Sequence, residues 1–241
     1  IVWLDPDAGS AAPLALQRLI LGGTEACFRK DTPAAALQEL NRFKILCAHK
    51  AGPHGVDAVN RAAEQLLVRQ GLIRPEAALA SPWYAHRPVL VTRNDYALGL
   101  FNGDIGMTLP DEASGGRGLF VFFPGGPGGM RRFLPYRLPE HETVYAMTVH
   151  KSQGSEFDEV LLVLPDRDSP VLTRELVYTA LTRARKTVTI WARRSIRAAA
   201  KLRTGPSAVN RIASSTWPSG LRTTRLSGRS PTSSRRPANM P

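Results

Sequence analysis

The sequence predicts an α/β fold: a parallel sheet with flanking helices, into which a small set of β-strands is inserted. Residues 12–70 show helical periodicity around one short apolar strand. From residue 87 the pattern changes to short strand-like runs separated by Gly, Pro, Asn and Asp turns. After Thr143 strands and helices alternate again. The inserted strands therefore divide one α/β domain into two stretches of sequence.

The first part, residues 1–86, is expected to supply leading helices and one strand of the parallel sheet. Thr32 followed by Pro33 is a favourable helix start, because Thr caps free N–H groups and Pro suits the first turn. The glycines of the 52–55 turn separate the strand from the helix that follows it. The expected elements, in order, are a helix over 12–22, a helix from Pro33 to about Phe43, a strand over 44–48 and a helix over 56–70.

The second part, residues 87–142, is expected to form a small inserted β-barrel. Its turns include Asn102-Gly103 and the glycine-rich run 125–129. The expected strands are 88–92, 104–109, 118–123 and 130–136.

The third part, residues 143–205, returns to the α/β pattern. We expect a strand up to Thr148, a strand over 159–164, a helix over about 174–185, a strand over 187–192 and a basic helix over 193–203. Beyond it, residues 206–241 are rich in Ser, Thr, Pro, Gly and Arg, and have too few large apolar residues to repay the entropy of ordering. We therefore expect a disordered basic tail.

The net charge of +12 is unevenly distributed along the 241 residues. Residues 176–241 contain 14 Lys or Arg and no acid, which leaves 18 basic and 20 acidic side chains upstream. A basic tail suits nucleic-acid binding through counterion release, and a solvated tail without a ligand is the alternative. Two cysteines without metal-ligand spacing indicate a reduced cytoplasmic protein, with a single disulfide as the alternative. The start has no basic signal-peptide region, and no apolar run approaches the ~20 residues of a membrane span.

Polar residues crowd the short loop after Thr148, between two apolar strands, where α/β sheets place ligand chemistry. The order T-x-H-K-S-Q-G-S-E-F over 148–157 resembles motif V of superfamily 1 helicases. Residues 173–185, T-R-E-L-V-Y-T-A-L-T-R-A-R, resemble motif VI. With L-C-A-H-K-A-G-P-H-G-V over 46–56 and N-D-Y-A-L-G-L-F-N-G-D over 94–104, they resemble RecD, the alpha subunit of exonuclease V (RecBCD), across about residues 40–203.

The resemblance implies a second RecA-like motor domain with an SH3-like insertion, and it assigns roles to individual residues. Arg183 holds the motif VI position of the arginine finger, which stabilises charge on the γ-phosphate during ATP hydrolysis; a cation at a helix end is the alternative. The remaining ATP contacts implied are Gly154, Glu156 and Lys50, with helix capping as the alternative for Glu156. The DNA contacts implied are Thr148, His150, Lys151, Ser152, Gln153, Asn94 and Asn102.

Several of these residues also have ordinary structural interpretations. His150 suits a core histidine, and Asn94 and Asn102 suit turns. Lys50 stands where RecD relatives often carry arginine, which weakens its assignment to the nucleotide. Tyr96 and Phe101 are able to stack on bases, but we expect them in the core.

The resemblance further implies ATP with Mg²⁺ as cofactor, single-stranded DNA as substrate, RecB and RecC as partners, and a bacterial cytoplasmic location. No G-x-x-x-x-G-K-[ST] phosphate loop occurs in the sequence. The family pattern places that loop and the magnesium ligands in a first motor domain, which we expect before residue 1. Two alternatives remain: a non-catalytic fragment that binds DNA or RecC, and part of a stand-alone RecD-like or conjugative helicase. The family pattern also ends at about Thr204, as expected of a truncated or frameshifted gene product.

Overall fold

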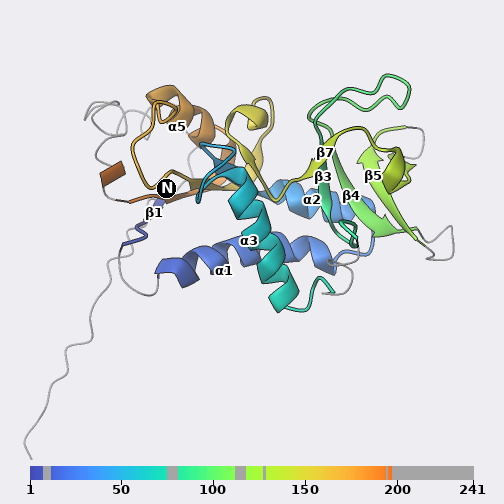
Figure 1. Ribbon diagram of the computed structural model, residues 1–241, viewed down its shortest axis with the longest axis horizontal. Coiled ribbons are helices and arrows are strands. Elements are labelled where there is room, and N and C mark those ends of the chain that lie inside the picture. The colour runs from blue at the N-terminus through green and yellow to red at the C-terminus, as the bar shows by residue number, and fades with distance from the viewer. Residues whose placement is uncertain (8–11, 75–80, 112–117, 127–128, 194, 197–241) are drawn as a thin grey trace, which may run out of the picture.

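The computed structural model describes residues 1–7, 12–74, 81–111, 118–126, 129–193 and 195–196. Within these residues the strands form two separate sheets, one parallel and one antiparallel (Figure 1). The predicted disordered tail over 206–241 and most of the predicted basic helix over 193–203 lie outside the described residues.

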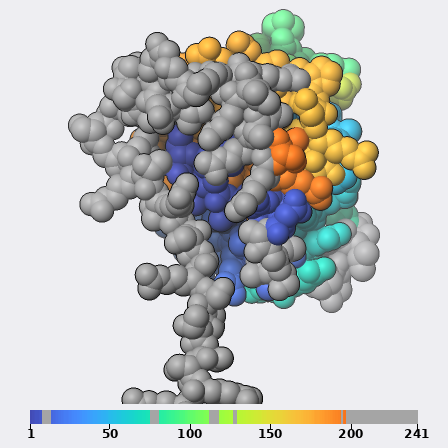
Figure 2. All heavy atoms as spheres, turned by 90° about the vertical axis from the view of Figure 1, so that its left-hand side faces the viewer, coloured from blue at the N-terminus to red at the C-terminus, as the bar shows by residue number. Residues whose placement is uncertain are grey.

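The parallel sheet confirms the α/β class that the alternating pattern predicted. Its strands lie in the order β1-β10-β9-β2-β8, and every neighbouring pair is parallel. Their bounds are β1 (Val2–Leu4), β2 (Phe43–Cys47), β8 (Ala146–Thr148), β9 (Phe157–Val163) and β10 (Ala184–Trp191). β1 was not predicted; it adds to the edge of the sheet through its pairing with β10, and the two lie together on the face shown in Figure 2.

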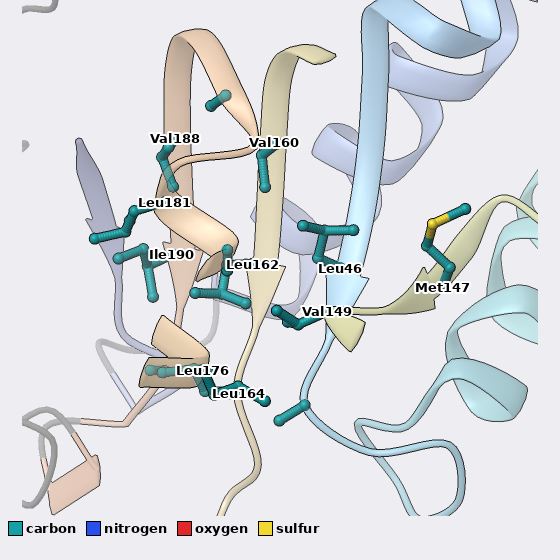
Figure 3. Close-up of a cluster of buried hydrophobic side chains, with 14 of the residues drawn as sticks. Leu46, Met147, Val149, Val160, Leu162, Leu164, Leu176, Leu181, Val188 and Ile190 are labelled. Carbon is teal, nitrogen blue, oxygen red and sulfur yellow. The ribbon is translucent and has the colours of Figure 1, made fainter. Parts of the chain in front are cut away.

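Helices cover both faces of this sheet. On one face α1 (Ala12–Thr24) and α3 (Val56–Arg69) bury apolar side chains such as Ile20, Val59 and Leu67 against the strands. On the other face α5 (Arg174–Leu181) packs Leu176 and Leu181 over the sheet. Figure 3 shows these two leucines beside the strand residues Leu46, Val160, Leu162, Val188 and Ile190.

Local signals explain where two of the helices, α2 and α5, begin. The Thr32 hydroxyl accepts a hydrogen bond from the Ala35 N–H at 3.4 Å, and Pro33 opens α2 (Pro33–Arg42), as predicted. Thr173 caps α5 in the same way through the Leu176 N–H at 3.2 Å. The prediction that this last helix continues to residue 185 is wrong: α5 ends at Leu181, because the chain joins β9 as strand β10 from Ala184.

The inserted residues form an antiparallel sheet with the order β6-β5-β4-β3-β7. The helix α2 covers one face, where Leu37 and Leu40 pack near Met107 and Leu109. The strands are β3 (Pro88–Val91), β4 (Ile105–Pro110), β5 (Leu119–Pro124), β6 (Met130–Phe133) and β7 (His141–Thr143). The pairings of the described residues give an open order, and closure into an SH3-like barrel stays a prediction.

The two sheets are joined by a very short connection. β7 is the last strand of the antiparallel sheet, and only the buried residues Val144 and Tyr145 separate it from β8 of the parallel sheet. Asn60 of α3 fixes this joint: its amide donates to the carbonyls of Thr143 (2.9 Å) and Ala146 (3.2 Å), and its oxygen accepts from the Ala146 N–H (2.8 Å). The position of β8 is thus tied to the antiparallel sheet and to α3.

Two features of the interior concern ionisable groups. Cys27 and Cys47 are buried free thiols, so the disulfide alternative is wrong. Lys44 of β2 is fully buried, lies 5.6 Å from the Phe157 ring centroid, and has no hydrogen-bond partner among the described residues. Burial lowers the pKa of Lys44 to about 8.

Candidate functional site

The motif V loop crosses from one edge of the parallel sheet to the other. β8 ends at Thr148, which pairs with Cys47, and Cys47 pairs with Val163 at the end of β9. The loop therefore starts at the carboxyl edge of the sheet. It ends at Phe157, the first residue of the parallel strand β9, at the amino edge. The two halves of the motif consequently serve two different surfaces.

The first half contains a short 3-10 helix, η4 (His150–Ser152), and a cluster of charges. Glu142 of β7 accepts from the Lys151 ammonium at 2.6 Å and from the Lys50 ammonium at 3.3 Å. Burial alone would raise the pKa of Glu142, but the hydrogen bond from Lys151 and the two positive charges outweigh it and lower the pKa. Two lysines share one carboxylate, so this group of three residues carries one net positive charge.

The other residues of the first half have different exposures. Thr148 is partly buried, and its hydroxyl accepts from the Lys151 N–H at 3.3 Å. His150 and Gln153 are exposed, so the alternative of a core histidine is wrong. Ser152 is fully buried and its hydroxyl donates to the Val149 carbonyl at 2.7 Å. The Ser152 hydroxyl thus stabilises the loop and is not exposed for contact with DNA.

Gly154 marks the turn between the two halves of the motif. Its φ of +84° lies in the left-handed region, and it is exposed with open space where a Cβ would stand. Any other L-residue here would strain the backbone. The glycine therefore sets the path that carries Ser155 and Glu156 to the amino edge.

Arg183 meets the second half of the motif at that edge. Its guanidinium donates to the Ser155 carbonyl at 3.0 Å, to the Thr179 carbonyl at 3.3 Å and to the Thr182 hydroxyl at 3.3 Å. The backbone repeats the link, since the Phe157 N–H donates to the Arg183 carbonyl at 2.8 Å. Arg183 lies in the turn after α5, so the alternative of a helix-end cation is partly correct: Thr179 is a last-turn carbonyl. The same side chain nevertheless joins motif VI to motif V.

Exposed ion pairs line the strands on both sides of Arg183. Glu156 pairs with Arg185 at 3.0 Å, and Asp158 pairs with Lys186 at 2.6 Å. Glu156 precedes the strand β9, so the helix-capping alternative for it is wrong. The helix predicted over about 174–185 would place Arg185 and Lys186 at its end, but they lie at the start of β10 instead. Such exposed pairs contribute little to stability. Arg185 can therefore exchange Glu156 for an anionic ligand, and Arg183 lies near it in sequence, in the turn that precedes β10.

The two predicted asparagines lie in the loop between β3 and β4, far from motif V in sequence. Both are exposed, and the Asn94 oxygen accepts from the Asn102 N–H at 2.8 Å. This is the turn chemistry that was the alternative for these residues. Sequence reasoning gave Glu142 no role, because its two lysine partners are recognisable only once the fold brings Lys50 beside it.

A cavity of about 300 Å³ opens at the carboxyl edge, between the loop after β2 and the loop after β9. Its lining includes His49, His54, Asp166 and Arg167.

No group of three or more His, Cys, Asp or Glu suited to a metal ion occurs in the part of the chain that the structure describes. None of its described helices is long and apolar enough to cross a membrane.

Comparison with known proteins gives the class of protein that the chain resembles. Residues 143–191 match the family described as UvrD-like helicase C-terminal domain. Over 165 residues the chain is 44% identical to the RecBCD enzyme subunit RecD of Mycobacterium tuberculosis, which covers 68% of this chain and 27% of that protein. The resemblance to the C-terminal portion of RecD, a superfamily 1 helicase subunit, is thereby confirmed.

A second type of relative is also similar. The ATP-dependent RecD2 DNA helicase of Deinococcus radiodurans is 37% identical over 183 residues, covering 76% of this chain and 22% of that protein. Among solved structures, Pif1 helicase from Bacteroides in complex with ADP-AlF3 and ssDNA aligns with a TM-score of 0.41 at 21% identity, covering 73% of this chain and 45% of that one. The chain spans about a quarter of the length of the curated relatives it matches.

Proposed function

We propose that the chain is the C-terminal part of an ATP-dependent 5′-to-3′ DNA helicase of RecD type that acts in double-strand break repair and recombination. In this proposal residues 1–86 and 143–205 form the second RecA-like motor domain, and residues 87–142 form an SH3-like insertion. The RecD relatives and the separate antiparallel sheet support this division.

The contact between Arg183 and Ser155 carries the proposal. In a motor that hydrolyses ATP, the nucleotide must influence the DNA-binding loop, and here the arginine-finger position touches the end of motif V directly at 3.0 Å. The residues fit a nucleoside triphosphate: two guanidiniums, Arg183 and Arg185, stand near a glycine that leaves open space. Arg183, Gly154 and Glu156 would face ATP, and bound ATP with Mg²⁺ supplies the phosphoryl group. Lys50 lies at the opposite edge beside Glu142, which favours a DNA contact over the predicted nucleotide contact.

The first half of motif V is the proposed DNA contact. Thr148, His150, Lys151 and Gln153 would contact phosphates, since ammonium groups and short donors position a strand without reading its bases. The net positive charge of the cluster formed by Lys50, Lys151 and Glu142 supports this assignment. Asn94 and Asn102 would contribute by shaping their loop.

The names of the relatives suggest two settings for the whole protein. The M. tuberculosis relative is named as a RecBCD subunit, so RecB and RecC are the proposed partners. The D. radiodurans relative is named as a helicase in its own right, which favours the stand-alone alternative. Co-purification of the full-length protein with RecB and RecC from the same genome distinguishes the two settings.

The helicase proposal is tested by comparing two proteins. The 241-residue chain lacks a phosphate loop, so we expect no ATP turnover with single-stranded DNA. A version extended to include a P-loop motor domain should show DNA-stimulated ATPase activity, and should unwind duplexes with a 5′ single-stranded tail in preference to those with a 3′ tail. Equal unwinding from both tails, or none, contradicts the proposed polarity. ATP turnover by the 241-residue chain contradicts the division of the site.

A further inference from the structure

The loop between β3 and β4 exposes two aromatic rings that were expected in the core. Tyr96 is 81% exposed and Phe101 is 46% exposed, and their ring centroids lie 5.9 Å apart at an interplanar angle of 75°. Two exposed aromatic rings in contact form an apolar patch, and such patches are candidate binding surfaces. In Figure 1 this loop, drawn in green, rises from the top of β3.

The rings are held on a rigid loop. Asp95 and Leu100 exchange two backbone hydrogen bonds, at 2.7 and 3.0 Å, and the Asp95 carboxylate accepts from the Leu98 N–H at 2.9 Å. The Asp104 carboxylate accepts from the Phe101 N–H at 2.9 Å. Below the loop, the Arg131 guanidinium donates to the carbonyls of Leu98 (3.2 Å) and Gly99 (2.9 Å). These polar side chains are occupied in fixing the backbone, so the exposed rings are the groups left for a ligand.

Packing explains why some apolar residues of the loop point inward and others do not. Leu100 is fully buried in the core on the outer face of the antiparallel sheet, and Leu98 packs against the same core. Gly99 between them has a φ of +62°, a conformation that reverses the chain at little cost only for glycine. Anchoring by the two leucines leaves Tyr96 and Phe101 directed away from the core.

The start of β7 links the loop to motif V. Glu140, the residue before β7, pairs with Arg93 at the base of the loop at 3.0 Å, and Glu142 within β7 pairs with Lys151 of motif V at 2.6 Å. The Thr92 N–H also donates to the Glu140 carbonyl at 2.8 Å. The base of the aromatic loop and Lys151 are therefore held by acidic residues two positions apart, which brings the loop close enough to motif V for one DNA strand to reach both.

We propose that Tyr96 and Phe101 form a stacking platform for unpaired bases of the single strand whose phosphates contact motif V. This inference rests on the proposed DNA-binding function and assigns the base contacts to residues other than the asparagines. Aromatic rings accept any base on their faces, so the platform suits a motor that moves along DNA without reading its sequence. The charged residues that hold this loop, Asp95, Asp104 and Glu140 with Arg93 and Arg131, carry a net charge of −1, so they give no net attraction for phosphate and attraction at this loop comes from the rings.

The test separates base contacts from phosphate contacts. The 241-residue chain is titrated with oligo-dT and with an abasic strand of the same length, which has the same phosphates and no bases, and binding is followed by fluorescence anisotropy. Contacts to phosphate, including those of the basic tail, are common to both strands and cancel in the ratio of affinities. We expect a preference for oligo-dT on the order of 5-fold or more, as one or two stacked bases would give.

The double variant Tyr96→Ala/Phe101→Ala should lose this preference and keep its affinity for the abasic strand. Tyr96→Phe should retain the preference, because the ring is unchanged. Tyr136→Ala is the matched control, since Tyr136 is also 81% exposed but lies in η3 (Pro135–Arg137), outside the loop. An unchanged preference in the double variant, with binding intact, overturns the platform alone and leaves the aromatic pair for a protein surface. If neither strand binds, the DNA-binding proposal fails, and the platform fails with it.

Discussion

The guanidinium of Arg183 donates a hydrogen bond to the carbonyl oxygen of Ser155, 28 residues earlier in the chain. The donor belongs to motif VI and the acceptor to motif V, and the Phe157 N–H closes the same link through the backbone. A ligand that draws the guanidinium away must break the contact to Ser155. The end of the proposed DNA-binding loop would then be released when an anion is bound.

Replacing Arg183 with Ala in a version that carries the P-loop domain should lower ATP turnover by ~10³-fold or more, because the γ-phosphate loses its arginine. Affinity for single-stranded DNA should change little. Arg183→Lys should restore little activity, since an ammonium lacks the planar fork. Steady-state ATPase and DNA titration measure both effects. Arg174→Ala, exposed at the other end of α5, is the control; turnover equal to that control would leave Arg183 a structural cation.

Replacing Lys151 with Ala should weaken binding of single-stranded DNA and reduce the dependence of log K on log salt by about 0.7, the value for one phosphate contact on a single strand. The measurement is a DNA titration across a salt series. Lys186→Ala serves as control, because Lys186 also pairs with a carboxylate but lies at the amino edge. A slope identical in both variants would remove Lys151 from the DNA contacts.

Replacing Asn60 with Ala should destabilise the fold and disturb motif V. The change leaves buried backbone groups of Thr143 and Ala146 without partners, and each such group costs roughly 1–3 kcal/mol. Urea denaturation should show a loss of about 2 kcal/mol or more. Gln65→Ala on an exposed position of the same helix should be nearly neutral. Equal stability of the two variants would show that the joint is held by packing alone.

Replacing Lys44 with Met should stabilise the protein at pH 7, and the gain should shrink as the pH rises. The folded pKa of Lys44, about 8, lies below its usual 10.5, so between these values the unfolded chain holds more protons and stability rises with pH. The penalty is fully present below pH 8 and is on the order of 3 kcal/mol. Burial raises the pKa values of the Cys27 and Cys47 thiols to about 12, so above pH 9 the folded state holds more protons than the unfolded chain at these residues and stability falls as the pH rises. The difference in urea stability between variant and wild type, measured at pH 7 and pH 9.5, largely cancels this thiol contribution. A gain that does not vary with pH would contradict the prediction.

Periodicity and caps predicted much of the fold, because these signals are local. The cap at Thr32 and the apolar face of α3 act within a few residues. Features that depend on distant partners were missed. Val2–Leu4 becomes a strand only because β10 lies beside it, and residues 184–186 leave the helical pattern because β9 provides a parallel neighbour. Tertiary pairing overrides local propensity in both cases.

The candidate site shows the same division. The sequence motifs made Arg183 and the loop after Thr148 candidates, since each occupies a recognisable position, and their roles stay predictions. The motifs did not identify Glu142, whose partner Lys50 is 92 residues away. Tyr96 and Phe101 were expected in the core, because the sequence beside Leu98 and Leu100 does not indicate whether these aromatic side chains point inward or outward. The left-handed Gly99 and the support from Arg131 decide that direction.

The two-residue joint between β7 and β8 leaves no slack between the inserted sheet and the motor sheet. Val144 and Tyr145 are buried, and Asn60 hydrogen-bonds to the backbone on both sides of them. A displacement of the insertion would therefore also displace the start of motif V. If the insertion contacts DNA, as proposed, force on it would be transmitted to the start of the motif V loop at Thr148. The insertion would then sense mechanical load on the DNA. Exchanging the insertion between relatives should preserve the coupling between insertion and motif V only when Val144 and Tyr145 are exchanged with it.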